Sequence, residues 1–278
     1  MIGYVFIFFI LLLEGIYFTA YNLQNAYPLF GTTLSAVTFI FLILVPVLTM
    51  KTIAEERKQK TDQLLLTAPV SVSEIVLGKF LAVATVYAIP VLIICLYPMI
   101  MGKYGTVSYA MAYTAVLGFA LLGFAQIAVG VFWSSVTENP VIAAVVTFIV
   151  LFVCYMITGI GSLIPDSSMA SLACYMLLVL LAAVWVYHMI RNLWIAAVIG
   201  IAGEAALAIT YVVKSTLFEG SIQKFLAVFD ITSHFDNFTN GILDLQGVVY
   251  FLSVIIIFLV LTVQTITKRK MEIRRLEE

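Results

Sequence analysis

Charged residues are scarce in this sequence. Lys, Arg, Asp and Glu make up only 10% of its 278 residues, whereas 63% are hydrophobic. A soluble domain carries about 25% charged residues, so this composition excludes a chain made of soluble domains. The longest polar stretch, residues 214–247, is too short to form one. The formal net charge of −1 gives no excess of basic residues, so nucleic acid is not an expected partner.

Motifs that carry chemistry are also lacking. The sequence has no Gly-x-x-x-x-Gly-Lys-Ser/Thr phosphate loop, no His and Cys cluster with metal-ligand spacing, and no Ser, His and Asp set on polar loops. Its three cysteines, Cys95, Cys154 and Cys174, lie in apolar runs at spacings that match no redox or metal motif. We therefore expect a chain that is not an enzyme and holds no metal or cofactor of its own.

Long apolar runs dominate the rest of the sequence. A membrane helix needs about 20 predominantly apolar residues, and eight runs reach this length. The runs predict an all-α, polytopic transmembrane helical bundle that forms a single domain over residues 1–278. The expected spans are Ile2–Ala20, Gly31–Met50, Phe80–Ile100, Tyr109–Trp133, Pro140–Ile164, Leu172–Ile190, Trp194–Val213 and Val248–Thr267. The pair covering 172–213 also fits a re-entrant hairpin.

The distribution of Lys and Arg predicts how the bundle is oriented. All but three of the 14 Lys and Arg residues fall in residues 51–79, in the turn at Arg191 or in the C-terminal tail. Because loops rich in Lys and Arg stay in the cytoplasm, that side is expected to be cytoplasmic. An even number of spans then places both termini inside. Residues 214–247 become an extracytoplasmic segment.

The cytoplasmic segment 51–79 has the pattern of a surface helix followed by a turn. Residues Thr52–Thr67 contain good helix formers, and Pro69 cannot continue a helix. Glu55 and Glu56 stand in the first turns, where acidic side chains interact favourably with the helix dipole. From composition alone this segment is either a connector that lies at the membrane surface or a docking element for a partner.

Two helix starts are marked by capping residues. Ser71 and Glu74 have the spacing of a capping box that opens the third span. Asn139 followed by Pro140 predicts another start, with Asn as the N-cap and Pro at the first helical position.

Two acidic residues fall inside predicted spans. Glu204 is near the middle of its helix, and Glu14 is in the outer half of the first span. A carboxyl group inside the membrane is a candidate functional site, and the alternative is a protonated or hydrogen-bonded acid packed between helices. No Lys or Arg inside a span is available to pair with either one.

Four stretches of the sequence carry a family pattern. The first is Glu55–Val70 together with Glu74–Phe80, and the others are Gly130–Asn139, His234–Phe238, and Gly241–Asp244 leading into Val248–Ser253. In these stretches the sequence resembles the ABC-2 type permease family, in particular the branch that contains the gliding-motility and nitrous-oxide-reductase maturation permeases. The sequence departs from the family pattern in having no cytoplasmic stretch before its first span and in the added pair of spans at 172–213.

The resemblance implies a role for the cytoplasmic segment. In such permeases the helix between the second and third spans docks on a separate ATP-binding subunit and couples ATP hydrolysis to transport. Carried over to this sequence, the coupling residues are Glu55, Glu56, Arg57, Thr61, Leu64, Leu65, Leu66 and Pro69. The charged ones would pair with the partner's surface, and the leucines would fill a groove or anchor the helix.

The implied protein is the permease subunit of an ABC exporter in the cytoplasmic membrane of a bacterium. ATP and Mg would be bound by the partner subunit, and a second permease chain, identical or paralogous, would complete the transporter in the lipid bilayer. An extracytoplasmic accessory protein is a further expected partner. Two other functions stay open from sequence: an ion- or proton-coupled secondary transporter using Glu14 and Glu204, and an ATPase-coupled membrane sensor or scaffold. The substrate cannot be read from these residues.

Overall fold

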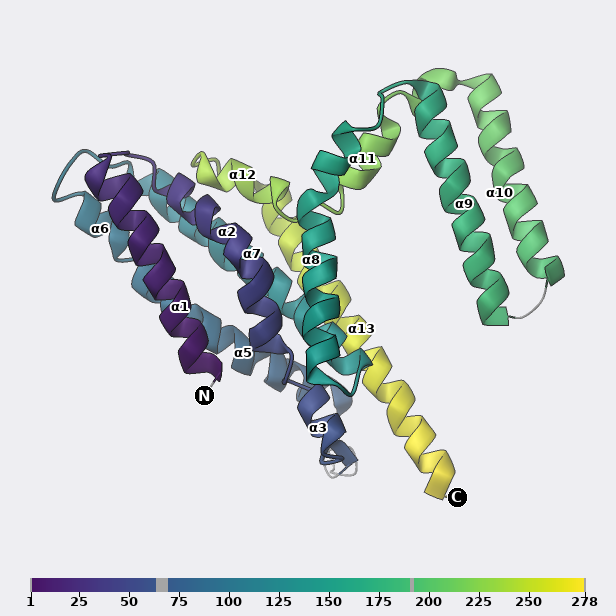
Figure 1. Ribbon diagram of the computed structural model, residues 1–278, viewed down its shortest axis with the longest axis horizontal. Helices are drawn as coiled ribbons and strands as arrows, with labels where there is room; N and C mark the ends of the chain where they lie inside the picture. The colour runs from purple at the N-terminus through teal and green to yellow at the C-terminus, as the bar shows by residue number, and fades with distance from the viewer. Residues whose placement is uncertain (1, 64–69, 191–192, 278) are drawn as a thin grey trace. The chain divides into compact units, whose positions relative to one another are not determined.

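The computed structural model describes residues 2–63, 70–190 and 193–277 (Figure 1). Every regular element within these ranges is a helix, which confirms the all-α prediction. The chain forms two compact units. Unit 1 comprises Met1–Val153 and Ile231–Glu278, and unit 2 comprises Cys154–Asp230.

Unit 1 is built around α7 (Tyr109–Val136). Three long helices pack against it: α2 (Phe30–Thr49), α5 (Val72–Ile94) and α13 (Leu245–Glu277). Helix α1 (Ile2–Tyr17) packs on α2 and α5. Because α7 packs against several helices, its side chains form the centre of the core of unit 1.

Small residues let α7 approach its neighbours closely. A Cβ atom at Gly130 would lie 2.2 Å from the Thr49 Oγ1 atom of α2, and one at Gly123 would lie 2.2 Å from the ring of Tyr87 on α5. Inside membranes, such small residues permit the backbone contact on which helix association depends. The Tyr87 hydroxyl then donates a hydrogen bond of 2.7 Å to the Phe119 carbonyl oxygen, which fixes α5 on α7.

The first membrane helix is longer than the sequence predicted. Helix α1 continues directly into the π-helical segment η1 (Phe18–Gln24), so the apolar helix runs past the expected end at Ala20. The polar end is held by Asn22, which donates to the Tyr27 carbonyl oxygen at 2.8 Å and accepts from the Thr33 hydroxyl at 2.5 Å. Glu14 therefore lies near the middle of the Ile2–Gln24 helix.

Both predicted capping arrangements are confirmed. The Glu74 N–H donates to Ser71 Oγ at 3.3 Å, and the Ser71 N–H donates to Glu74 Oε2 at 3.0 Å. The third apolar helix consequently begins at Val72, ahead of the predicted Phe80, and α6 (Tyr97–Met101) follows it. At the other start, α8 (Pro140–Ser162) begins at Pro140, and Asn139 Oδ1 accepts from the Val141 N–H at 3.0 Å.

Six described helices are long and apolar enough to cross a membrane. They are Ile2–Gln24, Phe30–Lys58, Val72–Met101, Tyr109–Val136, Pro140–Ser162 and Leu245–Met271. A bent pair, Gly200–Val213 with Ser215–Ala227 at 116°, would be a seventh. The chain is thus a polytopic helical bundle as expected, while the count of eight spans stays a prediction.

Unit 2 contains a pair of packed helices. Helix α8 enters it from unit 1, and α9 (Ser168–Ile190) packs on α10 (Leu193–Val213). A Cβ atom at Gly203 would lie 2.7 Å from a Val179 methyl group, so the two backbones approach closely. The short elements η2 (Ser215–Phe218) and α11 (Ser221–Ala227) follow. The predicted turn at Arg191, on which the choice between two spans and a hairpin depends, lies outside the described residues.

The segment after unit 2 returns to unit 1 and covers one end of its core. Helix α12 (Ser233–Thr239) contacts α7 and α2, and its Phe235 and Phe238 side chains are buried. A Cβ atom at Gly118 of α7 would lie 2.5 Å from Phe238. This contact is near the beginning of α7, so α12 covers the end of unit 1 that is opposite to the end of α7 at Val136.

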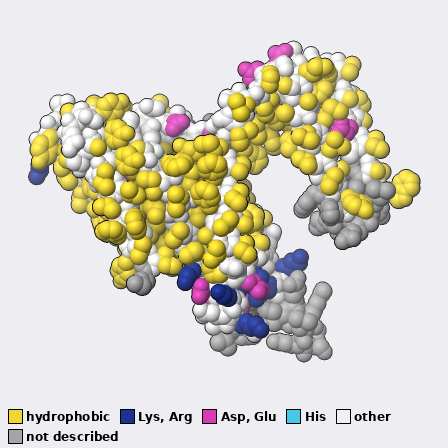
Figure 2. Space-filling view, viewed as in Figure 1, with side chains coloured by type: hydrophobic (Ala, Val, Ile, Leu, Met, Phe, Trp, Pro, Cys, Tyr) yellow, Lys and Arg dark blue, Asp and Glu magenta, His cyan; other side chains and the backbone are white. Residues whose placement is uncertain are grey.

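Charged side chains gather at that opposite end of unit 1, just past the band of hydrophobic side chains (Figure 2). The beginning of α1, the C-terminal part of α13 and the short helix α3 all lie toward it (Figure 1). The first and the last described helices therefore have their chain ends at the same end of the unit, which is compatible with the predicted even number of spans. That this end faces the cytoplasm is a prediction from the Lys and Arg distribution.

Cysteine labelling tests this orientation. We expect Gln59→Cys to react with a membrane-impermeant maleimide only from the cytoplasm and Tyr104→Cys only from outside, because the apolar helix Val72–Met101 separates them. The parent chain, whose three cysteines are partly buried, gives the background. Labelling of Gln59→Cys from outside would reverse the orientation. Labelling of Arg191→Cys from outside would overturn the eight-span model.

Candidate functional site

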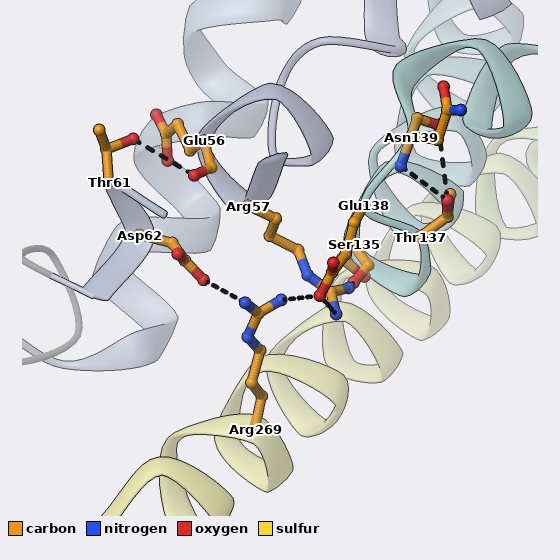
Figure 3. A network of polar contacts seen from close by, with 9 residues as sticks. All are labelled: Glu56, Arg57, Thr61, Asp62, Ser135, Thr137, Glu138, Asn139 and Arg269. Atoms are coloured by element: carbon orange, nitrogen blue, oxygen red, sulfur yellow. Dashed lines mark hydrogen bonds and ion pairs between the residues drawn. The ribbon is translucent and has the colours of Figure 1, made fainter. Parts of the chain in front are cut away.

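The segment after α2 is held against the ends of three other helices in unit 1. It contains α3 (Ala54–Lys58), and its polar contacts reach the beginning of α5. They also reach the end of α7 and the C-terminal part of α13 (Figure 3). We take this assembly, called the α3 site below, as the candidate functional site because it contains most of the described residues that the resemblance implied.

Ser134 is the inner anchor of the α3 site. Its hydroxyl oxygen accepts from the N–H groups of Ile53 and Ala54, both at 3.1 Å, and donates to the Met50 carbonyl oxygen at 3.1 Å. The side chain is fully buried. One hydroxyl on α7 therefore satisfies two of the N–H groups at the start of α3, which a helix start leaves without intrahelical partners.

Arg57 forms the second link to α7. Its Nη1 donates to the Ser135 carbonyl oxygen, and its Nη2 lies 3.5 Å from Glu138 Oε1. Only 15% of the Arg57 side chain is exposed. Because a guanidinium group keeps its charge and offers several donors in a fixed geometry, Arg57 joins α3 to the turn between α7 and α8.

Arg269 brings α13 into the same network. Its Nη2 lies 3.0 Å from Asp62 Oδ2, and its Nη1 lies 3.4 Å from Glu138 Oε1. Glu138 is therefore shared by two guanidinium groups from different helices (Figure 3). Asp62 is 10% exposed. Burial raises the pKa of its carboxyl group, and the nearby charge of Arg57 opposes this shift.

Lys79 links the α3 site to α5. Its Nζ donates to the Thr52 carbonyl oxygen at 3.0 Å and to Glu56 Oε1 at 2.5 Å. The Lys79 side chain is 17% exposed, so the pair is partly shielded from water. Lys51 and Glu55 form a second, local ion pair at 3.6 Å. Through Lys79 the segment is joined to α5, in addition to its contacts with α7 and α13.

The prediction of one helix over Thr52–Thr67 is wrong in its described part. Helix α3 ends at Lys58, and Lys60 adopts a left-handed backbone with φ of 60°. The Thr61 N–H closes this turn on the Glu56 carbonyl oxygen at 3.0 Å. The physical reason is the set of contacts beyond the turn, because the change in direction carries Asp62 to Arg269.

The implied coupling residues differ in where they point. Arg57 and Glu56 interact with their own chain, so their described partners are not on another protein. Glu55 and Thr61 lie on the outer side, where Glu55 accepts from the Gln59 amide at 3.0 Å and Thr61 is exposed. Leu64, Leu65, Leu66 and Pro69 lie outside the described residues.

Several members of the α3 site were missed from the sequence. They are Asp62, Lys79, Ser134, Ser135, Glu138 and Arg269. The turn that contains Ser134, Ser135 and Glu138 lies in Gly130–Asn139, one of the stretches that carried the resemblance. The position of these three residues in that stretch was the signal in the sequence that could have identified them as site residues. Nothing in the spacing of Arg269 pointed to Asp62.

The two candidate acids inside the membrane lie in different units. Glu14 on α1 in unit 1 is fully buried, and neither of its oxygens has a hydrogen-bond partner among the described residues. Glu204 lines a cavity of about 670 Å³ between α9 and α10 of unit 2. Its Oε1 is buried without a partner in the described part of the chain. Polar atoms buried in this way cost free energy, so both positions are unusual for residues that serve packing alone.

The contacts of the α3 site suit it to mechanical linkage between helices. Its residues are joined by ion pairs and by hydrogen bonds to the backbone. Among the described residues, no group of three or more His, Cys, Asp or Glu could hold a metal ion. A partner that moves α3 would pull on three helices of unit 1 at once.

Comparison with known proteins gives a family. A family model described as an ABC-2 family transporter protein matches residues 8–271, which extends over both units. Neither the comparison with curated proteins nor the one with solved structures finds a match. The matched stretch includes the α3 site, most of the first apolar helix and the whole of the other apolar helices described above. The chain is therefore a multi-pass membrane protein that belongs to the ABC-2 family of transporter proteins.

Proposed function

We propose that this chain is the permease subunit of an ABC exporter and that the α3 site couples it to a separate ATP-binding subunit. The observation that carries the proposal is the network in which Arg57, Glu138, Arg269 and Asp62 join α3 to the turn after α7 and to α13. ABC-2 family permeases generally work with an ATP-binding subunit, and this network supplies a route from such a partner into the bundle.

The linkage is stiff because it is short and made of many contacts. Helix α3 has only five residues, and Ser134, Arg57, Lys79 and Arg269 act on it or on the turn that follows it. Closely packed elements move as bodies instead of deforming. When two ATP-binding subunits close on ATP, a docked α3 would carry that motion to α5, α7 and α13 together.

The remaining parts of the transporter follow from this role. The partner subunit binds ATP and Mg, and a second permease chain, identical or paralogous, completes the assembly in the cytoplasmic membrane of a bacterium. The outer side of the segment, with Glu55 on α3 and Gln59 directly after it, is the part left for the partner. The family match supports ATP-driven transport over an ion- or proton-coupled mechanism through Glu14 and Glu204.

Co-purification tests the proposal. We expect an affinity-tagged chain, extracted in mild detergent from its native membrane, to retain a second protein that hydrolyses ATP. The control is the same chain carrying Glu55→Lys and Gln59→Glu, which reverses or adds charge on the outer side of α3 and leaves Arg57, Lys79 and Arg269 in place. Equal retention by both chains would place the docking surface elsewhere. Absence of any ATPase from both would contradict an ABC permease.

A further inference from the structure

A basic cavity lies inside the α3 site. It has a volume of about 210 Å³ and is bounded by the α3 segment, α5, the end of α7 and α13. Its charged lining residues are the cations Arg57, Lys79, Lys268 and Arg269 and the acids Glu56 and Asp62. The cations outnumber the acids of the lining, and the charge of Glu138, which pairs with Arg57 and Arg269 from outside the lining, reduces this positive excess without cancelling it.

Two donors of the cavity have neither a hydrogen bond nor an ion pair with a described residue. Arg57 Nε is buried and has no hydrogen-bond partner there. Lys268 is exposed and forms no ion pair with another described residue. Since a buried donor without an acceptor costs free energy, an anion with several acceptor oxygens would be stabilised between these two side chains.

The position of the cavity indicates where such an anion comes from. Its walls also contain the apolar side chains of Ile53, Ile75, Val136 and Ile266. The cavity therefore lies where the hydrophobic band of unit 1 meets its charged end (Figure 2), which is the level of lipid headgroups. Basic pockets between membrane helices on the cytoplasmic side are suited to anionic headgroups.

We propose that this cavity binds a phosphate group, carried by an anionic phospholipid of the inner leaflet. The phosphate oxygens would accept from Arg57 Nε and from the Lys268 ammonium group, and the glycerol and upper acyl chain would lie along the apolar wall. Bound there, the lipid would bridge α3 and α13 beside the ion pair between Asp62 and Arg269. Lipid binding needs no ATPase, so the inference is independent of the proposed function.

Native mass spectrometry of the purified full chain tests this site. Released from micelles doped with equal amounts of phosphatidylglycerol and phosphatidylcholine, the chain is expected to retain phosphatidylglycerol preferentially. Removing one cation near an anionic headgroup weakens binding about fivefold, so Lys268→Gln should reduce this retention by about that factor. The matched control is Lys58→Gln, which removes an exposed charge at the same end of unit 1 outside the cavity.

A second arm separates the two sources of phosphate. Inorganic phosphate alone is titrated against the chain freed of lipid, with thermal stability as the readout. A shift that Lys268→Gln removes would support the site with free phosphate as its occupant, and no shift beside selective lipid retention would support the lipid. Equal retention of both lipids together with no effect of phosphate would overturn the proposal. So would an equal loss of retention in the Lys58→Gln control.

Discussion

Replacing Arg57 with alanine is expected to leave the chain in the membrane but to lower substrate-stimulated ATPase activity of the reconstituted transporter about tenfold. The guanidinium group donates to the Ser135 carbonyl oxygen and pairs with Glu138. A hydrogen bond from a charged group contributes about 1.5–3 kcal/mol, and coupling free energies of this size correspond to changes of about 5- to 150-fold. Glu138 is 65% exposed, so its ion pair adds little, and the loss is mainly that of the contact to Ser135.

Two variants control the Arg57 experiment. Lys58→Ala removes a charge from the same short helix at an exposed position and should leave stimulation unchanged. Arg57→Lys keeps the charge without the two-pronged geometry and should give an intermediate value. Basal and stimulated ATPase activities of all variants are measured in liposomes at matched protein levels. Normal stimulation in Arg57→Ala would show that the link between α3 and α7 carries no coupling.

The substitution Gly130→Ala is expected to destabilise unit 1 by about 1–3 kcal/mol, the usual cost of overpacking a core. The new Cβ would lie 2.2 Å from Thr49 Oγ1 and 2.8 Å from Thr49 Cβ. Thr49 cannot easily turn away, because its hydroxyl donates to the Val45 carbonyl oxygen at 2.9 Å. The helices α2 and α7 must therefore move apart, close to the anchor that Ser134 provides for α3.

A second glycine on a membrane helix provides the control. At Gly78 of α5 a Cβ would meet no atom within 4 Å, so Gly78→Ala should be neutral or stabilise the helix by up to about 1 kcal/mol. Both variants are heated in detergent and the remaining monodisperse fraction is measured by size-exclusion chromatography. If both alanines behaved alike, the close contact between α2 and α7 would not contribute to stability as described.

Local patterns predicted most of the helices of this protein. Runs of apolar residues were sufficient because a membrane helix satisfies its backbone hydrogen bonds within one segment. Ser71 with Glu74, and Asn139 before Pro140, predicted helix starts because capping involves residues only a few positions apart.

Contacts between distant segments were beyond the reach of such patterns. The segment Thr52–Thr67 has helix-forming residues throughout, yet α3 ends at Lys58, because Asp62 is drawn to Arg269 on the last helix. The sequence predicts an end of the first span at Ala20. The structure extends that helix to Gln24 by giving Asn22 partners at Tyr27 and Thr33. In the first case the partner is far along the chain, and in the second the partners lie beyond the end of the helix, 5 and 11 residues after Asn22.

Site-specific cross-linking from α3 tests the central claim most directly. A photo-reactive group placed at Gln59, which is exposed beside α3, is irradiated in native membranes, and the same group at Tyr104, which is 80% exposed, serves as the control at the other end of the apolar helix. The proposed function predicts that Gln59 cross-links to a separate chain with a phosphate-loop motif and that Tyr104 does not. Failure of Gln59 to reach such a chain, or an equal yield from Tyr104, would contradict the assignment of α3 as the coupling element.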